Sequence, residues 1–263
     1  MRWAMGEKGE GQKIRPGPWR GVTEAGIFPF PVPRSPFPVT LRSIAAVKTA
    51  RYAVLGPEEG PVSEVWVACH GYGQLAPYFA RHFRAAQAPG RLIVVPEALS
   101  RFYLGDLTGP NRRVGASWMT REDRETDIAD TVRYLDDTFV AACARADADP
   151  LAVPLVGFGF SQGTATVTRW LALSPLLARR DRRAERLILW GGALPHDLDL
   201  AAQPWLRESG VTLVAGDRDA FATPARILEQ EARLRAAKVP FESVQFAGEH
   251  RLHERTLREV SQP

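Results

Sequence analysis

Ser161 stands between two glycines in the pentapeptide GFSQG, residues 159–163. The apolar run 153–158 precedes it, and from Thr164 onward apolar residues recur at helical spacing. A serine at a sharp strand-to-helix turn, with small neighbours that let the strand and the helix pass closely, exposes its hydroxyl as a nucleophile. The turn also aims backbone N–H groups and the positive end of the helix dipole at one point. The pattern therefore predicts a nucleophile at Ser161, against the alternative of a glycine-rich turn that holds a serine by chance.

A serine nucleophile requires a base, and the base requires a carboxylate that orients it. Asp217 and Asp219 follow one apolar run near the C-terminus, and His250 and His253 follow the next. We expect Asp219 to be the acid, because Asp217 directly follows the strand end, where it would brace the loop. We expect His250 to be the base, because it ends the last predicted strand, whereas His253 lies in the turn or helix that follows.

The hydrolysis of an ester also requires hydrogen-bond donors for the oxyanion. The sequence CHGYGQ, residues 69–74, follows another apolar strand, and its glycines free a backbone N–H to face a substrate. We predict that the backbone N–H groups of Tyr72 and Gln162 form the oxyanion hole. His70 is expected to brace this loop, and Cys69 to be a small packing residue and not a second nucleophile.

Seven short apolar runs alternate with amphipathic stretches along the chain. Continuous runs of Val, Leu and Ile are typical of parallel strands that are covered on both faces. Thr223 followed by Pro224 predicts the start of a helix, and apolar residues between Ile128 and Phe139 predict another. The alternation predicts an α/β fold with a mostly parallel sheet, in a single domain over residues 39–263. The predicted strands are 49–56, 64–71, 91–98, 153–160, 186–193, 211–217 and 241–248.

Residues 1–38 differ from the rest in composition, because prolines alternate with aromatic and small residues. This favours an extended or disordered leader, since proline prevents strand pairing and favours polyproline II. A docking arm for a proline-recognising groove and upstream DNA translated from a wrong start codon are the alternatives.

A long non-periodic insert at about residues 99–123 separates a predicted strand from a helix. Loops of this length in compact domains are usually functional or disordered, and the aromatic residues of this one favour a short lid or a pocket wall. Its arginines, Arg112, Arg113 and Arg121, are expected to be solvated, with an acidic substrate group as the alternative ligand. The predicted substrate-binding residues are Phe102, Tyr103, Leu104, Trp118 and Met119.

The composition excludes several classes of protein. The net charge of +4 comes from arginines scattered along 263 residues, with no dense basic block, so nucleic acid is not an expected partner. Cys69 and Cys143 are the only cysteines and form no C-x-x-C motif, so neither a zinc site nor a disulfide framework is expected. No apolar run reaches the length of a membrane span, and no secretory signal is recognisable. We expect a cytoplasmic protein without integral membrane association, with a homodimer as one possible assembly.

These motifs together resemble those of the phospholipase/carboxylesterase family of α/β-hydrolases, which includes the acyl-protein thioesterases. HGYG (70–73), GFSQG (159–163), GGALP (191–195), Asp219 and His250 occur in the family's order over about residues 49–260. The resemblance implies an α/β-hydrolase fold, with helices on both faces of the sheet, and the hydrolysis of esters or thioesters without a cofactor or a metal. It implies that Ser161 is the nucleophile, Asp219 the acid and His250 the base.

The predicted function is that of a serine hydrolase, of the carboxylesterase or thioesterase type, acting on small esters. A serine peptidase on the same scaffold is one alternative, which a panel of amide and ester substrates would distinguish. A catalytically silent homologue that binds a small ligand or a partner is the other alternative. The presence of serine, acid and histidine in the expected order favours the enzyme.

Overall fold

The computed structural model describes residues 40–57, 61–105 and 112–262. Contacts divide the chain into two units, residues 1–46 and residues 47–263. Of the first unit, residues 40–46 are described, and they are exposed and form neither helix nor strand. The predicted leader, residues 1–38, lies outside the described residues. The second unit holds all the helices and strands that the structure describes.

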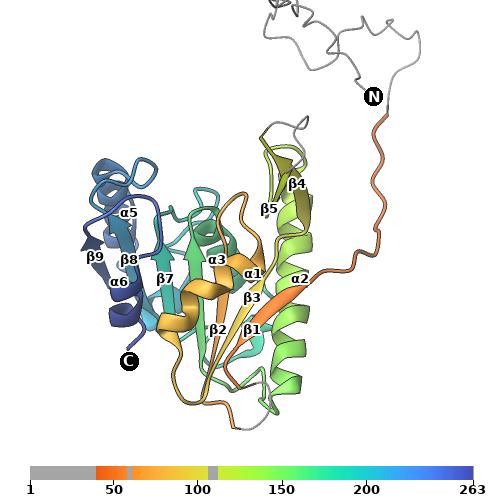
Figure 1. Ribbon diagram of the computed structural model, residues 1–263, viewed down its shortest axis with the longest axis horizontal. Coiled ribbons are helices and arrows are strands. Elements are labelled where there is room, and N and C mark those ends of the chain that lie inside the picture. Colours follow the sequence, from red (N-terminus) through yellow and green to blue (C-terminus); the bar gives the residue numbers. More distant parts are fainter. Residues whose placement is uncertain (1–39, 58–60, 106–111, 263) are drawn as a thin grey trace, which may run out of the picture. The chain divides into compact units, whose positions relative to one another are not determined.

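Seven strands form one sheet in the order β1-β3-β2-β6-β7-β8-β9 (Figure 1). Strand β1 pairs with β3 in the antiparallel direction, and all other neighbours in this sheet are parallel. All seven strands predicted from apolar runs are confirmed. Their bounds are Tyr52–Leu55 (β1), Glu64–Cys69 (β2), Arg91–Pro96 (β3), Leu155–Phe160 (β6), Arg186–Trp190 (β7), Gly210–Gly216 (β8) and Phe241–Phe246 (β9).

Each face of the sheet is buried under its own set of helices. Along β2, Val65 and Val67 belong to one core cluster, whereas Trp66 and Ala68 belong to the other, because successive side chains of a strand point to opposite faces. Burial on both sides explains why the strands are continuously apolar. One core contains side chains from α2 (Arg124–Arg145), α3 (Gln162–Leu173) and α5 (Pro224–Ala236), and the other contains side chains from α1 (Ala76–Phe79), η1 (Ala80–Ala86) and α6 (Glu254–Val260).

The start of α5 follows its sequence signals closely. Thr223 has an extended backbone, its side chain accepts a hydrogen bond from the N–H of Arg226, and Pro224 is the first helical residue. This confirms the predicted helix start. Two short elements complete the described helices, η2 (Leu177–Arg179) and α4 (Trp205–Glu208). Of the helices in the described ranges, none combines the length and the hydrophobicity that crossing a bilayer requires.

The insert predicted as a non-periodic loop is a β-hairpin, so that prediction is wrong in its secondary structure. Strands β4 (Ser100–Leu104) and β5 (Arg113–Ser117) pair in the antiparallel direction, and residues 106–111 between them lie outside the described residues (Figure 1). The side chains of β4 are exposed or half-buried. Because no face of this strand is fully buried, its sequence does not need the alternation of apolar and polar residues by which a strand is recognised. On its other side β5 makes an isolated bridge between Ala116 and Gln74, in the loop after β2.

Candidate active site

Ser161 occupies a strained corner between β6 and α3. Its backbone angles are φ 54° and ψ −117°, outside the regions that residues with side chains usually adopt. A methyl group on Gly163 would lie 2.1 Å from the carbonyl oxygen of Cys69, and one on Gly159 would lie 2.5 Å from that of Gly163. Only glycines fit at these two positions, which confirms that the serine needs small neighbours where the strand and the helix pass closely. The N–H of Ser161 donates to the carbonyl of Trp190 at 2.9 Å, which ties the corner to β7.

Buried Asp219 and half-buried His250 form an acid–base pair. The Nδ1 of His250 lies 2.8 Å from Oδ2 of Asp219. The other carboxylate oxygen, Oδ1, accepts the backbone N–H groups of Phe221 and Ala222, both at 2.8 Å. Asp219 is only 4% exposed, so these three bonds compensate for the lost hydration of a charged carboxylate. A proton on Nδ1 that is donated to Asp219 leaves Nε2 of His250 as the basic nitrogen.

The alternative residues make structural contacts instead. Asp217 accepts the N–H of Gly248 at 2.8 Å and so braces the loop after β9. His253 caps α6 through Thr256, whose hydroxyl lies 2.8 Å from its Nδ1. The ring of His253 also stacks on Phe246, with 5.2 Å between ring centroids. The geometry therefore pairs Asp219 with His250, as expected, and engages Asp217 and His253 elsewhere.

A turn at Gly191 and Gly192, after β7, lies between Ser161 and the acid–base pair. A methyl group on Gly191 would lie 3.2 Å from both Asp219 and His250, and one on Gly192 would lie 2.3 Å from the carbonyl oxygen of Ser161. The described hydrogen bonds include none between the Ser161 hydroxyl and His250. Such bonds are often long in hydrolases before substrate is bound. The backbone of Ser161 and the side chains of Asp219 and His250 thus adjoin one glycine turn, at the carboxyl ends of β6, β8 and β9.

The two amides predicted to form the oxyanion hole are both free to donate. Within the described residues, neither the N–H of Tyr72 nor that of Gln162 meets a protein acceptor, whereas both neighbours of Tyr72 do. The N–H of Gly71 donates to the side-chain oxygen of Gln74 at 2.8 Å, and that of Gly73 donates to the hairpin. Gln162 is the first residue of α3, and the first N–H groups of a helix have no partner inside it.

His70 holds the loop after β2 in place. Its Nδ1 lies 2.7 Å from the carbonyl oxygen of Gly71, and its Nε2 accepts the N–H of Ala98 at 3.1 Å. Burial lowers the pKa of His70 to about 4, which keeps the ring neutral, although the Gly71 contact opposes this shift. The adjacent Cys69 is fully buried, and burial raises the pKa of its thiol. A protonated thiol inside the core is inert, which fits the packing role expected for it.

The low pKa of His70 predicts a pH-dependent stability. The unfolded chain binds a proton on this ring below about pH 6.5, while the folded chain does not until about pH 4, so folding weakens as the pH falls between these values. In urea unfolding, the free energy of unfolding of wild type should fall across this pH range by about 3 kcal/mol more than that of the variant His70→Asn. Parallel pH curves for the two proteins would contradict the assignment.

A pocket of about 500 Å³ adjoins Ser161 on the side of β7 and α5. Gln230 forms part of its wall and is held in place, because its side-chain oxygen accepts the N–H of Leu194 at 3.0 Å. Phe221 lines the pocket as well, and its ring centroid lies 4.7 Å from that of His250. The lining residues are Ser161, Gly191, Gly192, Ala193, His196, Phe221, Ala222, Arg226, Ile227, Glu229 and Gln230.

None of the five residues predicted to bind substrate lines this pocket. Phe102 packs on Tyr72, with 5.1 Å between ring centroids, so the hairpin borders the loop after β2. Tyr103 is half exposed and Leu104 is half-buried, and for these three residues a contact with substrate stays a prediction.

Trp118 and Met119 lie elsewhere than predicted. Trp118 is only 3% exposed, and its indole N–H donates to the carbonyl of His70 at 2.7 Å. Both residues line a small separate pocket between α2 and α3, where a guanidinium nitrogen of Arg169 lies 3.4 Å from the sulfur of Met119. The sequence pattern did not distinguish an aromatic residue that packs beneath the loop from one that faces the substrate.

The residues at the start of α5 that form the pocket wall were not among those predicted from the sequence. Two signals point to it: the Gly191-Gly192 pair after a buried strand, which marks a turn, and the cap at Thr223 so soon after Asp219. Together they place the first turn of a helix beside the acid loop. Neither signal says which side chains of that helix face Ser161, because that depends on how α5 packs against the sheet.

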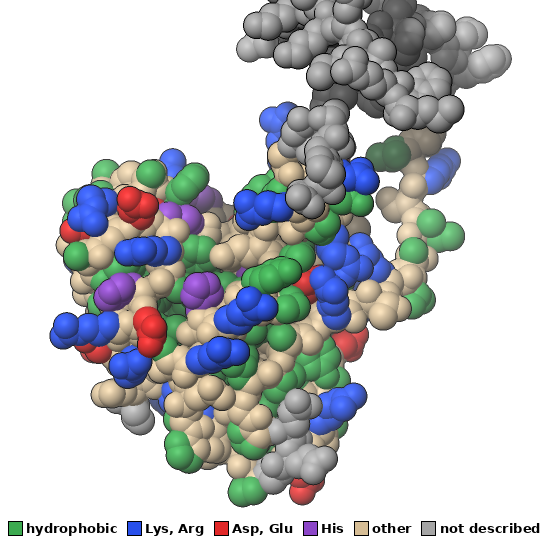
Figure 2. Space-filling model, in the orientation of Figure 1, with side chains coloured by type: hydrophobic (Ala, Val, Ile, Leu, Met, Phe, Trp, Pro, Cys, Tyr) green, Lys and Arg blue, Asp and Glu red, His purple; other side chains and the backbone are tan. Residues whose placement is uncertain are grey.

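The insert arginines Arg112, Arg113 and Arg121 are exposed, as the sequence suggested. Arg112 lies over the ring of Tyr103 at 4.8 Å, and both Arg113 and Arg121 are exposed. Figure 2 shows Lys and Arg side chains distributed over one face, with acidic side chains between them. Within the described ranges no group of His, Cys, Asp and Glu has the arrangement of a metal site.

The sheet order, the strained serine at the end of β6 and the acid and histidine after β8 and β9 define an α/β-hydrolase fold. Solved structures similar to this chain include esterase PE8 (19% identity, 81% of this chain and 97% of that chain, TM-score 0.54). Others are acyl-protein thioesterase 2 of Zea mays (19%, 81% and 96%, TM-score 0.55) and a phospholipase/carboxylesterase of Dyadobacter fermentans (14%, 82% and 97%, TM-score 0.56). At these identities the likeness establishes the fold. No family model and no curated protein matches the sequence.

Proposed function

We propose that this protein is a serine hydrolase that cleaves small carboxylic esters, or thioesters, through an acyl-enzyme. The observation that carries the proposal is the Asp219–His250 pair, joined at 2.8 Å, which adjoins the same Gly191-Gly192 turn as the strained Ser161. A residue other than glycine keeps such an unfavourable backbone conformation only where the surrounding structure enforces it. Residues of this kind are concentrated at active sites. The names of the similar structures, esterase, thioesterase and carboxylesterase, support the same class of reaction.

In the proposed first half-reaction, Ser161 Oγ attacks the acyl carbon while its proton passes to Nε2 of His250. The ester carbonyl becomes an oxyanion, which accepts the backbone N–H groups of Tyr72 and Gln162. Asp219 stabilises the imidazolium through Nδ1. The bond to the leaving group then breaks, and His250 returns the proton to the departing alcohol or thiol.

In the second half-reaction water takes the place of the alcohol. His250 removes a proton from the water, whose oxygen attacks the acyl carbon of the ester formed with Ser161. The same two amides hold the oxyanion. Collapse of this intermediate breaks the bond to Oγ and releases the carboxylic acid, and His250 returns the proton to Ser161, which restores the resting enzyme.

The pocket beside Ser161 favours small substrates with polar groups over long acyl chains. Its lining includes a guanidinium at Arg226, a carboxylate at Glu229 and an imidazole at His196. A long aliphatic chain in this space would remove water from all three groups without giving them hydrogen bonds, which is unfavourable. p-Nitrophenyl acetate and butyrate are therefore suitable first substrates.

The direct test is covalent labelling with a fluorophosphonate probe, followed by peptide mapping. We expect one label per chain, on Ser161, because only an activated serine attacks such a probe. Heat-denatured protein is the control for non-specific reaction. A wild-type protein that neither takes up the probe nor hydrolyses the two esters would support the catalytically silent alternative and contradict the proposal.

A further inference from the structure

The segment Ser117–Met119, which begins at the last residue of β5, connects the two halves of the proposed oxyanion hole. The backbone N–H of Trp118 donates to the side-chain oxygen of Gln162 at 3.2 Å. The indole N–H of the same residue donates to the carbonyl of His70 at 2.7 Å. The amide nitrogen of Gln162 in turn donates to the carbonyl of Met119 at 2.9 Å. One residue therefore bonds to the serine corner with its backbone and to the loop after β2 with its side chain.

We propose that Trp118 is a positioning residue that sets the distance between the N–H groups of Tyr72 and Gln162; this rests on the proposed function. The sheet aligns the two strands only as far as the pair Cys69 and Gly159. Beyond that pair the chain after β2 leaves the sheet, and β6 continues for one residue, Phe160, which pairs only with β7. Contacts outside the pairing of β2 and β6 therefore hold the two amides at one spacing. An oxyanion donor is effective only within about 2.7–3.1 Å of the oxygen, so this spacing matters for catalysis.

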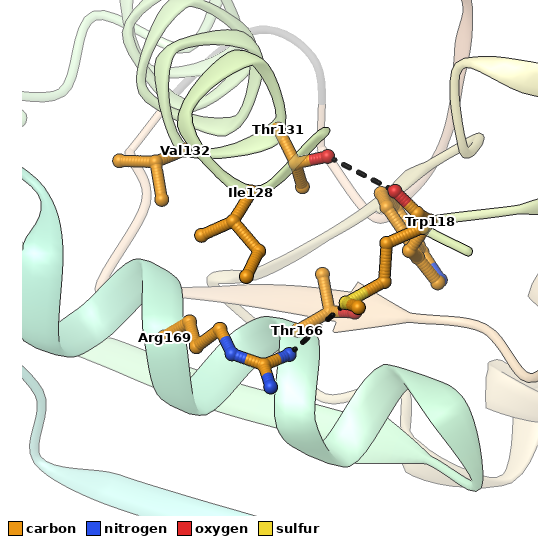
Figure 3. Close-up of a pocket in the computed structure, with 7 residues that line it drawn as sticks. Trp118, Ile128, Thr131, Val132, Thr166 and Arg169 are labelled. Carbon is orange, nitrogen blue, oxygen red and sulfur yellow. Dashed lines mark hydrogen bonds between the residues drawn. The ribbon is translucent and has the colours of Figure 1, made fainter. Parts of the chain in front are cut away.

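Trp118 is itself held by contacts with His70, with Thr131 of α2 and with the residues around the adjacent small pocket. Its ring lies beside that of His70, with 4.9 Å between centroids, and it is 3% exposed. Its carbonyl accepts the hydroxyl of Thr131 on α2 at 3.4 Å. Figure 3 shows this contact, with Ile128 of α2 and Arg169 of α3 on either side of the pocket next to Trp118. A side chain so tightly packed has little room to move, so the groups that are hydrogen-bonded to it keep fixed positions.

The loop after β2, which Trp118 contacts at His70, is also fixed by hydrogen bonds on the other side of Tyr72. The N–H of Gly73 donates to the carbonyl of Ala116, and the N–H of Ala116 donates to the carbonyl of Gln74, at 2.9 and 3.1 Å. A methyl group on Gly115 would lie 2.4 Å from the carbonyl oxygen of Gly73, so this strand and this loop approach as closely as backbones can. Tyr72 lies between residues that are fixed on both sides.

The test compares two tryptophans that make equivalent bonds. Trp118→Phe keeps an aromatic ring beside His70 and removes the N–H. Trp170→Phe removes an indole N–H that donates to Asp136 at the same distance, 2.7 Å, in a fully buried part of α3. For p-nitrophenyl acetate we expect Trp118→Phe to lower kcat by about 10- to 100-fold with little change in KM, a part of the 10²–10³ that a lost oxyanion donor costs. Trp170→Phe should lower the melting temperature and leave kcat unchanged.

A second measurement separates positioning from a loss of structure. A trifluoromethyl ketone forms a tetrahedral adduct with a serine nucleophile, and its inhibition constant should rise for Trp118→Phe by the same factor as kcat/KM falls. Gln162→Met keeps the backbone N–H and removes the side-chain hydrogen bonds. It should show the same lower kcat and higher inhibition constant, and it replaces Trp118→Phe in the test if that variant does not fold. Unchanged kcat in both variants, or equal losses in the two tryptophan variants, would overturn the inference. Failure of the proposed function would show earlier, as wild-type protein without turnover that depends on Ser161.

Discussion

Replacing Ser161 with alanine should lower kcat for p-nitrophenyl acetate by about 10⁶-fold, because the acyl-enzyme cannot form without Oγ. The fold should survive, since the known bond of Ser161 to β7 comes from its backbone N–H and not from the hydroxyl. Alanine is also smaller than serine and creates no contact at the crowded corner. The melting temperature of the variant should therefore lie close to that of wild type.

The matched control is Ser243→Ala on β9. This serine donates its hydroxyl to Glu231 at 2.6 Å on an exposed part of the surface, so the substitution also removes one serine hydroxyl but leaves the site untouched. Initial rates measured side by side for wild type and both variants check the prediction. A Ser161→Ala protein that retains most of the wild-type rate would exclude the acyl-enzyme mechanism.

The second large effect is expected for Asp219→Asn. Oδ1 of Asp219 accepts two backbone N–H groups, from Phe221 and Ala222, so the amide of an asparagine must turn its oxygen toward them. Its NH₂ group then points at Nδ1 of His250, which can no longer donate. The proton moves to Nε2, the nitrogen that must accept the proton of Ser161. A wrong tautomer of this kind lowers kcat by about 10⁴.

Asp217→Asn provides the comparison within the same loop. Asp217 also accepts a backbone N–H, from Gly248, and an asparagine oxygen can replace that acceptor. We expect this variant to keep the wild-type kcat. Steady-state kinetics of the two variants therefore test which aspartate is the acid: a large loss in Asp217→Asn with little loss in Asp219→Asn would reverse the assignment.

The strands and the serine corner were predictable because their signals are local. A strand buried on both faces must be apolar along its length, as β3 and β6 are, and this is visible in a few consecutive residues. The corner at Ser161 is visible in five consecutive residues, and a methyl group on Gly159 would collide with the backbone of Gly163 in the same corner, whereas the contact that requires Gly163 comes from Cys69. The cap at Thr223 is another signal of this kind.

The hairpin β4–β5 was not predictable in the same way. It is half exposed, and the contact that buries Gly115 comes from Gly73, which is far away in the sequence. Short hairpins are marginal by themselves and depend on what they pack against. The sequence of β4 therefore lacks the alternation that a strand covered on one face would show.

By itself the sequence determined the fold class, the order of serine, acid and histidine, and the glycines that the serine corner requires. Only the tertiary structure paired His250 with Asp219 and not with Asp217, bonded the indole of Trp118 to His70 in the loop after β2, and put α5 beside Ser161. The physical reason is the range of the interactions. Backbone conformation and burial act over a few residues, whereas the partners of these side chains are supplied by strand order and helix packing across the whole domain.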